Sequence, residues 1–343
     1  MRPSFFHHLH PPTIPAAQSR WRYTLGAGGT AVYLVVVLIF TGILEMFYYI
    51  PTPEAAGASI QTITFLVPFG GILRNLHFWA AQLLVIVVVI HLLRVIFTGA
   101  YAPPRRFNYL LGLILLVLCL FLDFTGYILR WDEGIYWALV AGTNLVATIP
   151  FLGPSLYTFV TGGSQTGPAT LIRFYAWHTF GLTLILAGIG GWHLFRVRRD
   201  GGIAVAPPQH RSDPARISRF DLVRREGLAM LVVMIILLLM STFFPAPLAA
   251  PITENTSLAN DSGAPWFFLW VQQLLKLGNP FLMGVFIPAI VLIFLALIPY
   301  FLPGPRREEL GRWLPRGNRI ARVIVAAIVC VLMFLTVQAA FFS

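Results

Sequence analysis

Seven apolar stretches alternate with polar segments along the chain, and each is long enough to cross the hydrocarbon core of a bilayer. A transmembrane helix needs about 20 residues, and lipid leaves the backbone no alternative to a helix or a closed barrel. These stretches lack the strict alternation of barrel strands, so the pattern predicts an all-α polytopic membrane protein. The expected helices are residues 28–50, 76–98, 109–129, 176–197, 227–244, 281–301 and 320–342.

Arginines distinguish the two sides of the predicted membrane. They are concentrated in residues 1–27, 99–108, 198–226 and 302–319, whereas the alternate segments hold few basic residues. The positive-inside rule places the N-terminus and the arginine-rich segments in the cytoplasm. This alternation also makes the second and fourth helices parallel.

Composition narrows the class of protein. Of the 343 residues, 57% are hydrophobic and 11% are charged, which is typical of a polytopic membrane protein. The net charge of +11 does not indicate nucleic-acid binding, because the basic residues flank membrane helices. Cys119 and Cys330 lie inside apolar stretches and fit neither a disulfide framework nor a zinc site. The polar start of the chain does not resemble a cleavable signal peptide.

Two of the predicted helices each contain two histidines. His77 and His91 are 14 residues apart, and His178 and His193 are 15 residues apart. At about 1.5 Å and 100° per residue, each pair spans roughly 21 to 22 Å and returns to within roughly 40° or 60° of one face. Parallel helices would bring His77 opposite His178 and His91 opposite His193. Each facing pair can hold one haem iron from both sides; the alternative is histidines that only hydrogen-bond a neighbouring helix.

Glycines repeat this spacing on the other two helices of the first four. Gly28 and Gly42 are 14 residues apart, as are Gly112 and Gly126. Glycine allows a bulky flat group to approach a helix backbone, as a haem edge at each level would require. Close packing between helices is the alternative.

Two long outer segments, residues 130–175 and 245–280, are rich in glycine, proline and aromatic residues. The first is too polar to span a membrane, so we expect one or two short surface helices there. Aromatic side chains at this level are either interfacial anchors or the roof of a pocket for an amphipathic ligand. Residues 200–225 are predicted to be a cytoplasmic linker between a four-helix unit, residues 1–205, and a three-helix unit, residues 206–343, which completes the outer pocket.

Four blocks of sequence resemble the cytochrome b family of quinol-oxidising bc and bf complexes. They are TGILEMFYYIPT from Thr41, RNLHFW from Arg74, HLLRVIFTGAY from His91 and TLIRFYAWHTF from Thr170. The resemblance covers nearly the whole chain, and the 15-residue second spacing is similar to the photosynthetic bf type. In that type the four-helix and three-helix parts are separate proteins, whereas here they are joined. The eighth helix of the family's larger version has no residues left to form it.

The resemblance implies two noncovalent b haems. His77 and His178 would ligate the outer iron, and His91 and His193 the inner one. Arg94 and Arg106 would pair with haem propionates, unless they are arginines that extend to the membrane surface.

The resemblance also implies quinol oxidation on the outer side and quinone reduction on the inner side. The outer pocket would lie near Gly126, Trp131, Ile149, Pro150, Pro265, Trp266 and Phe267. Asp221 is the candidate proton carrier of the inner pocket. One electron would leave to a Rieske-type iron–sulfur protein, and the other would cross the membrane to the inner side. The chain has no cysteine–histidine cluster and no CxxCH, so the Rieske protein and a c-type cytochrome would be partner subunits. The expected setting is a dimeric complex in the cytoplasmic membrane of a prokaryote.

Two features depart from the family pattern. The outer loop of the family carries Pro-Glu-Trp-Tyr, whose glutamate takes a quinol proton, whereas the matching residues here are Ala264 to Phe267. Glu254 or Asp261 is a candidate replacement for the absent carboxylate. The bf type attaches an extra haem through a cysteine, and none lies between Arg20 and Gly42. A third haem, if present, would therefore be noncovalent.

Two other functions fit parts of the pattern. The missing loop glutamate fits a di-haem membrane anchor that passes electrons between the quinone pool and a different redox partner without bifurcation. Buried histidines also fit a haem-free transporter that uses them as a proton relay.

Overall fold

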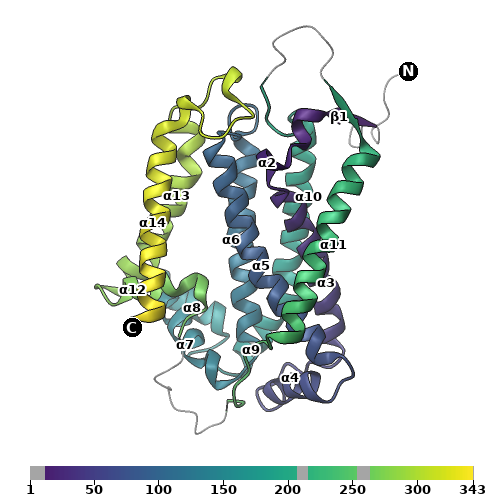
Figure 1. Cartoon of the computed structure of the whole chain (residues 1–343). Coiled ribbons are helices and arrows are strands. Elements are labelled where there is room, and N and C mark those ends of the chain that lie inside the picture. The colour runs from purple at the N-terminus through teal and green to yellow at the C-terminus, as the bar shows by residue number, and fades with distance from the viewer. Residues whose placement is uncertain (1–11, 207–214, 253–262, 343) are drawn as a thin grey trace.

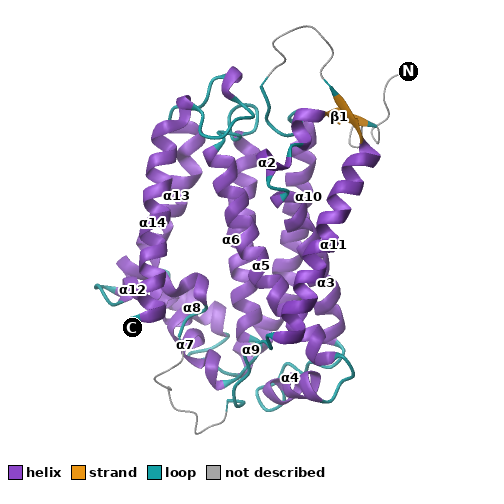
Figure 2. Ribbon diagram, in the orientation of Figure 1, coloured by secondary structure: helices purple, strands orange, loops and turns teal. Residues whose placement is uncertain are grey.

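The computed structural model describes residues 12–206, 215–252 and 263–342. Seven helices that are long and apolar enough to cross a membrane run side by side (Figure 1), as the hydropathy pattern predicts. Helices dominate the described chain, and one two-stranded antiparallel sheet lies at one end of the bundle (Figure 2). The structure therefore confirms the all-α, seven-span fold class.

The spanning helices lie between two sets of shorter elements. The spans are α3 (Ala27–Met46), α5 (Gly70–Phe97), α6 (Arg106–Ile128), the continuous α9, η2 and α10 (Pro168–Ala176, Trp177–Gly181 and Leu182–Arg199), α11 (Arg219–Phe243), η4 with α13 (Leu282–Phe286 and Ile287–Phe301) and α14 (Arg319–Phe341). The side that the charge pattern predicts to face outward, called the outer side below, holds α4 (Ala56–Phe65), α7 (Glu133–Ala147), α8 (Gly153–Thr161), η3 (Trp266–Phe268) and α12 (Leu269–Leu275). The arginine-rich side holds β1 (Thr13–Pro15), η1 (Ala16–Ser19), α2 (Trp21–Thr24), β2 (Arg216–Ser218), η5 (Arg307–Glu309) and η6 (Arg316–Asn318).

Several helices begin before the apolar stretches that predict them. α5 begins at Gly70 rather than residue 76, and the fourth span begins at Pro168 rather than residue 176. α11 begins at Arg219, so part of the predicted linker is helix; the Ser218 hydroxyl caps it by accepting a hydrogen bond from the Asp221 N–H. Hydropathy misses these first turns because they are polar or amphipathic. For the same reason the sequence did not predict α4 and the outer helices in detail.

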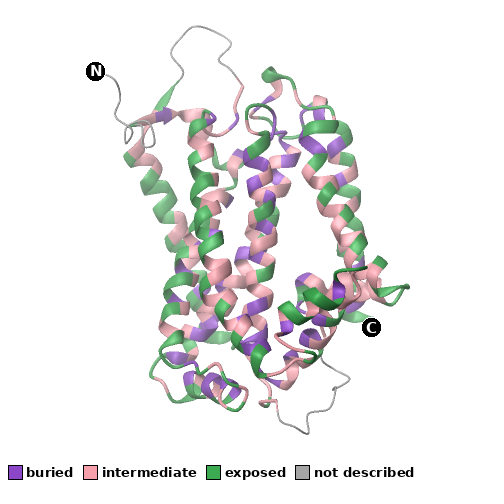
Figure 3. Cartoon of the chain, turned by 180° about the vertical axis from the view of Figure 1, so that it is seen from behind, coloured by how far each residue is buried: buried purple, intermediate pink, exposed green. Residues whose placement is uncertain are grey.

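The three C-terminal spans are divided between two faces of the first four. α3 packs against α5 and α6 against α10, while α11 packs against α5 and α3. α13 and α14 pack against α6 and α5 on the other face (Figure 1). Buried positions are therefore most frequent on α5 and α6, which have neighbours on both sides (Figure 3). On the arginine-rich side, β1 pairs with β2, which joins residues Thr13–Pro15 to the segment just before α11.

Candidate functional site: two histidine pairs between four helices

The structure brings the histidines of α5 together with those of the fourth span. The rings of His77 and His178 face each other with their centres 6.3 Å apart and their planes at 68°. One level further from the outer surface, His91 is close enough to His193 to interact with it electrostatically. The two pairs therefore lie at separate depths in the bundle, as the spacing predicts.

The separation of the outer pair suits a shared metal ion. A metal–imidazole bond is about 2 Å long, so two imidazoles on opposite sides of one iron have ring centres roughly 6 Å apart. The observed separation of 6.3 Å between the ring centres is close to this value. Two histidines that merely filled space would not need to meet at this distance.

Each of the four predicted glycines packs against one histidine. A methyl group added at the glycine would lie close to the imidazole Cε1: 3.3 Å for Gly28 and His91, 3.2 Å for Gly42 and His77, 3.3 Å for Gly112 and His193, and 2.6 Å for Gly126 and His178. The groups that the glycines admit in this structure are therefore the imidazole rings. The role of glycine in admitting a flat group stays a prediction.

Three of the four histidines have an oxygen partner on Nδ1. His77 Nδ1 lies 2.8 Å from Thr41 Oγ1, His178 Nδ1 lies 3.0 Å from the Leu122 carbonyl and 3.1 Å from Thr125 Oγ1, and His193 Nδ1 lies 3.1 Å from the Asn108 carbonyl. A carbonyl only accepts, so Nδ1 donates in the last two rings. The Thr41 hydroxyl donates to the Val37 carbonyl and therefore accepts from His77. In all three rings this assigns the proton to Nδ1 and leaves Nε2 with a free lone pair, the state that binds a metal.

His91 lacks such a carbonyl partner because α3, the helix that carries Gly28, begins only at Ala27. The carbonyls beside His178 and His193 belong to the residue four positions before the packed glycine. Four positions before Gly28 is Thr24, which precedes α3 and is separated from it by left-handed backbone at Leu25 and Gly26. Among the described residues, His91 Nδ1 consequently has no hydrogen-bond partner.

A π-helical turn begins next to His178. Residues Trp177–Gly181 form η2, and the Thr183 hydroxyl donates to the His178 carbonyl five positions earlier. A π turn contains one more residue than an α turn, so it takes up the extra residue of the 15-residue spacing. His178 and His193 are thereby returned toward one helix face, as the 14-residue pair is. Single π turns are frequent at functional sites.

The two predicted arginines lie in different surroundings. Arg94 is buried, its Nε donates to the Tyr23 carbonyl at 2.9 Å, and its guanidinium lies 4.2 Å from the Tyr23 ring centre. Its Nη2 is buried without a partner among the described residues, and Arg94 is near enough to His91 to interact electrostatically. A buried cation with a free donor fits an anionic group such as a propionate. Arg106 is exposed and lies 5.7 Å from the Tyr300 ring centre.

The predicted outer-pocket residues surround the outer end of α6. Trp131 is buried in the apolar core formed with α4, α7 and α9. Ile149 and Pro150 form the turn between α7 and α8. Pro265, Trp266 and Phe267 begin η3, where Phe267 is buried and Trp266 is exposed.

Phe124, which the sequence did not single out, connects these segments. Its ring centre lies 5.8 Å from that of Phe268 in η3 and 6.3 Å from that of Phe174 in α9. Gly142 of α7 also packs against the Phe124 ring. No property of an isolated phenylalanine in an apolar helix indicates such a position.

The remaining candidates are a helix-capping residue and two residues outside the described chain. The Asp221 carboxylate accepts a hydrogen bond from the Ser218 hydroxyl at 2.7 Å within the first turn of α11, so its role as an inner proton carrier stays a prediction. Glu254 and Asp261 lie outside the described residues.

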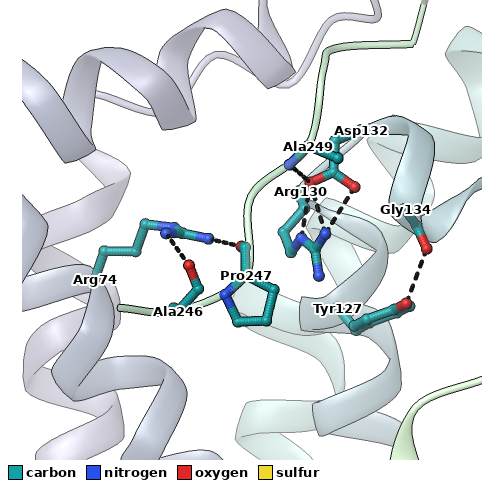
Figure 4. Close-up of polar contacts among 8 residues, drawn as sticks. All are labelled: Arg74, Tyr127, Arg130, Asp132, Gly134, Ala246, Pro247 and Ala249. Atoms are coloured by element: carbon teal, nitrogen blue, oxygen red, sulfur yellow. Dashed lines mark hydrogen bonds and ion pairs between the residues drawn. The ribbon is translucent and has the colours of Figure 1, made fainter. Parts of the chain in front are cut away.

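A polar clamp on the outer side was also missed by the sequence reasoning (Figure 4). Arg74, three residues before His77, is buried and donates to the carbonyls of Ala246 and Pro247 in the segment after α11. Arg130 forms an ion pair of 2.7 Å with Asp132, whose carboxylate accepts a backbone N–H of the same segment. The sequence does not predict these contacts, because they depend on the path of a segment far away along the chain.

Comparison with known proteins identifies the family of the chain. Residues 14–201 match the family model described as cytochrome b/b6/petB. The cytochrome b6 of Heliobacterium modesticaldum is 41% identical over 174 residues, which is 51% of this chain and 82% of that protein. The cytochrome b subunit of the menaquinol:cytochrome c reductase of Geobacillus thermodenitrificans is 35% identical over 175 residues, 51% of this chain and 78% of that protein.

The fold has a counterpart among solved structures. A chain of the structure titled hyperthermophilic respiratory Complex III superposes with a TM-score of 0.79, at 21% identity, over 94% of this chain and 85% of its own. The likeness of fold thus extends beyond the part that the family model matches, into the C-terminal helices. The chain is a member of the cytochrome b/b6 family.

Proposed function

We propose that this chain is the cytochrome b subunit of a bc/bf-type membrane quinol oxidoreductase complex and that it carries two b haems. Family membership implies haem b binding, which argues against a haem-free transporter. The names of relatives in menaquinol-oxidising and b6-type systems support the quinol-linked activity. The family match ends at residue 201, which supports dividing the chain into a four-helix unit, residues 1–205, and a three-helix unit, residues 206–343.

The observation that carries the proposal is the facing of His77 and His178 at 6.3 Å, each with its Nδ1 proton held by an oxygen. These two residues would hold the outer iron, and His91 and His193 the inner one. When bound, the haems would supply one-electron redox chemistry at two depths of the membrane. The protein keeps each Nε2 free, orients the rings by packing them on glycine, and offers Arg94 to a negative charge near the inner pair.

Quinol would be oxidised on the outer side, close to Phe124 and the segment Pro265–Phe267. The positive-inside rule supports an N-terminus in the cytoplasm, and the proposed location is the cytoplasmic membrane of a prokaryote. A Rieske-type iron–sulfur protein and a c-type cytochrome would accept electrons on the outer side, because this chain contains no cysteine motif for either centre. The quinone pool and membrane lipid complete the environment, and the complex would be a dimer. Asp221 is kept as the candidate of an inner quinone pocket.

Haem counting and single-histidine variants test the proposal. A pyridine haemochrome assay on purified complex should give two b haems per chain, and H178A should lose the outer haem while keeping the inner one. One haem or none in the native protein would overturn the di-haem assignment.

A second function, a di-haem anchor without bifurcation, is favoured by the presence of Pro265 where the family loop has its glutamate. The two are separated by adding an oxidant in the presence of quinol and an inner-site inhibitor. Bifurcation predicts that the oxidant causes haem b to become reduced; an anchor shows no such reduction.

A further inference from the structure

Three side chains from distant segments form a hydrogen-bonded chain beside the outer histidine level. The Trp266 indole N–H in η3 donates to Gln82 Oε1 of α5 at 2.6 Å, and Gln82 Nε2 donates to Asp123 Oδ1 of α6 at 3.2 Å. Both ends of the Gln82 amide are therefore used, which fixes its orientation. The chain connects the loop segment Pro265–Phe267 directly to a carboxylate inside a membrane span.

Asp123 lies in α6 between two residues that contact an outer histidine and the aromatic group around η3. It follows Leu122, whose carbonyl accepts from His178 Nδ1, and precedes Phe124, whose ring contacts Phe268. Acidic side chains at membrane depth are rare and usually functional, because burying a charge is costly. Asp123 has no ion pair with an arginine or lysine in the described chain, so a structural salt bridge does not explain it.

We propose that Asp123 is a catalytic residue of quinol oxidation in the outer pocket and that Gln82 is its positioning residue. This inference rests on the proposed function. Oxidation of a quinol to a quinone releases two electrons and two protons. One quinol O–H bond would break with transfer of its proton to the Asp123 carboxylate, which becomes a carboxylic acid and later releases the proton to water. The proton of the second O–H bond would pass directly to water on the outer side. The electrons leave to the iron–sulfur partner and the b haem named above.

The loop itself cannot perform this task. Ala264, Pro265, Trp266 and Phe267 contain no group that accepts a proton at neutral pH. Trp266 instead donates its N–H toward Gln82, and Gln82 directs its own N–H to Asp123. The amide thus holds the carboxylate at the side of α6 that faces η3.

The other titratable groups near α6 do not compete for this role. Cys119, one turn away on α6, interacts with Asp123, and η3, α12, η4 and α13 contain no acidic or basic residue. The charged and histidine side chains on the remaining helices against α6 are Arg74, His77, His91 and Arg94 on α5, Glu133 on α7, Arg173 on α9, His178 on η2, and His193, Arg196, Arg198 and Arg199 on α10. In the described chain none of them forms an ion pair with Asp123.

The test uses the intact complex with menadiol as the quinol and compares D123N, D123E, Q82L and C119A. D123N should keep both haem b bands but lower kcat for menadiol oxidation by roughly 100-fold, the usual contribution of a general base, and lose the fall in rate at acid pH. D123E should restore part of the rate. Q82L should reduce kcat less than D123N and shift the acid limb, whereas C119A, one turn away on the same helix, should behave as wild type.

D123N oxidising menadiol at the wild-type rate and with the wild-type pH profile would overturn the inference and leave the proposed function standing. A wild-type complex that binds no haem b or oxidises no quinol would overturn both. If D123N fails to assemble, Q82L provides the test of the inference. A wild-type rate and pH profile in Q82L would contradict the positioning of Asp123 by Gln82.

Discussion

The outer and inner histidine pairs share one plan, but they differ in what holds the imidazole rings. At the outer level both Nδ1 atoms have partners, His77 on Thr41 and His178 on Leu122 and Thr125. At the inner level His193 has a backbone carbonyl, and His91 Nδ1 has no partner among the described residues. A hydrogen-bond acceptor on Nδ1 strengthens the metal-binding nitrogen and favours the oxidised metal. With two haems bound, we therefore expect the outer haem to have the lower potential, so that electrons move inward.

The first prediction, with the largest expected effect on haem content, compares how α5 and the fourth span set the spacing of their two histidines. Deleting Val87 from α5 rotates His91 by about 100° relative to His77, because that helix has no π turn to take up the change. Deleting Thr183 should instead convert η2 to an α turn and preserve both pairs with a 14-residue spacing. Haem content measures the difference: we expect one haem or none without Val87 and two without Thr183. Loss of a haem in the Thr183 deletion alone would contradict the role of η2.

The second prediction compares glycine contacts. A methyl group at Gly126 would meet His178 at 2.6 Å, against 3.3 Å for Gly112 and His193. G126A should therefore lose the outer haem, while G112A should retain both haems with a shifted spectrum. Gly29 has nothing within 4 Å of an added methyl group, so G29A is the matched control and should be unchanged. Equal haem contents in G126A and G112A would show that Gly126 is not packed more closely against His178 than Gly112 is against His193.

The spacing of the histidines and glycines predicts which of these residues meet, because spacing along a helix is a local property of the sequence. Seven spans and the pairing of His77 with His178 follow from counting residues and charges, whereas the orientation of the spans in the membrane stays a prediction. The π turn does not, because the sequence gives only a 15-residue interval and not where the extra residue is taken up. The same holds for Asp123 and Gln82, which are 41 positions apart and meet only because α5 packs against α6. The clamp from Arg74 to Pro247 depends on the path of a distant loop.

The third prediction removes the side-chain partners at the outer level. T41V deletes the hydroxyl that accepts from His77, and the potential of the outer haem should rise by roughly 60 mV or less, the equivalent of a tenfold change in relative affinity for the two iron states. T125V should shift it in the same direction, and both shifts stay partial because His178 keeps the Leu122 carbonyl and His77 keeps its backbone interaction with Leu38. Redox titration followed by optical spectra resolves the two haems. A shift confined to the inner haem would reverse the assignment of levels.

The fourth prediction, with the smallest expected effect, adds a hydroxyl partner for His91 Nδ1 at the inner level. Thr41 precedes Gly42 and Thr125 precedes Gly126, whereas Ala27 precedes Gly28. Because Gly28 packs against His91 as Gly42 packs against His77, A27T places a hydroxyl where the outer level has one. The potential of the inner haem should fall, narrowing its separation from the outer haem, while A31T, one turn further along α3, should leave it unchanged. If A27T leaves the separation intact, the absence of a partner for His91 does not set the difference between the two levels, and Arg94 beside it becomes the group to vary next.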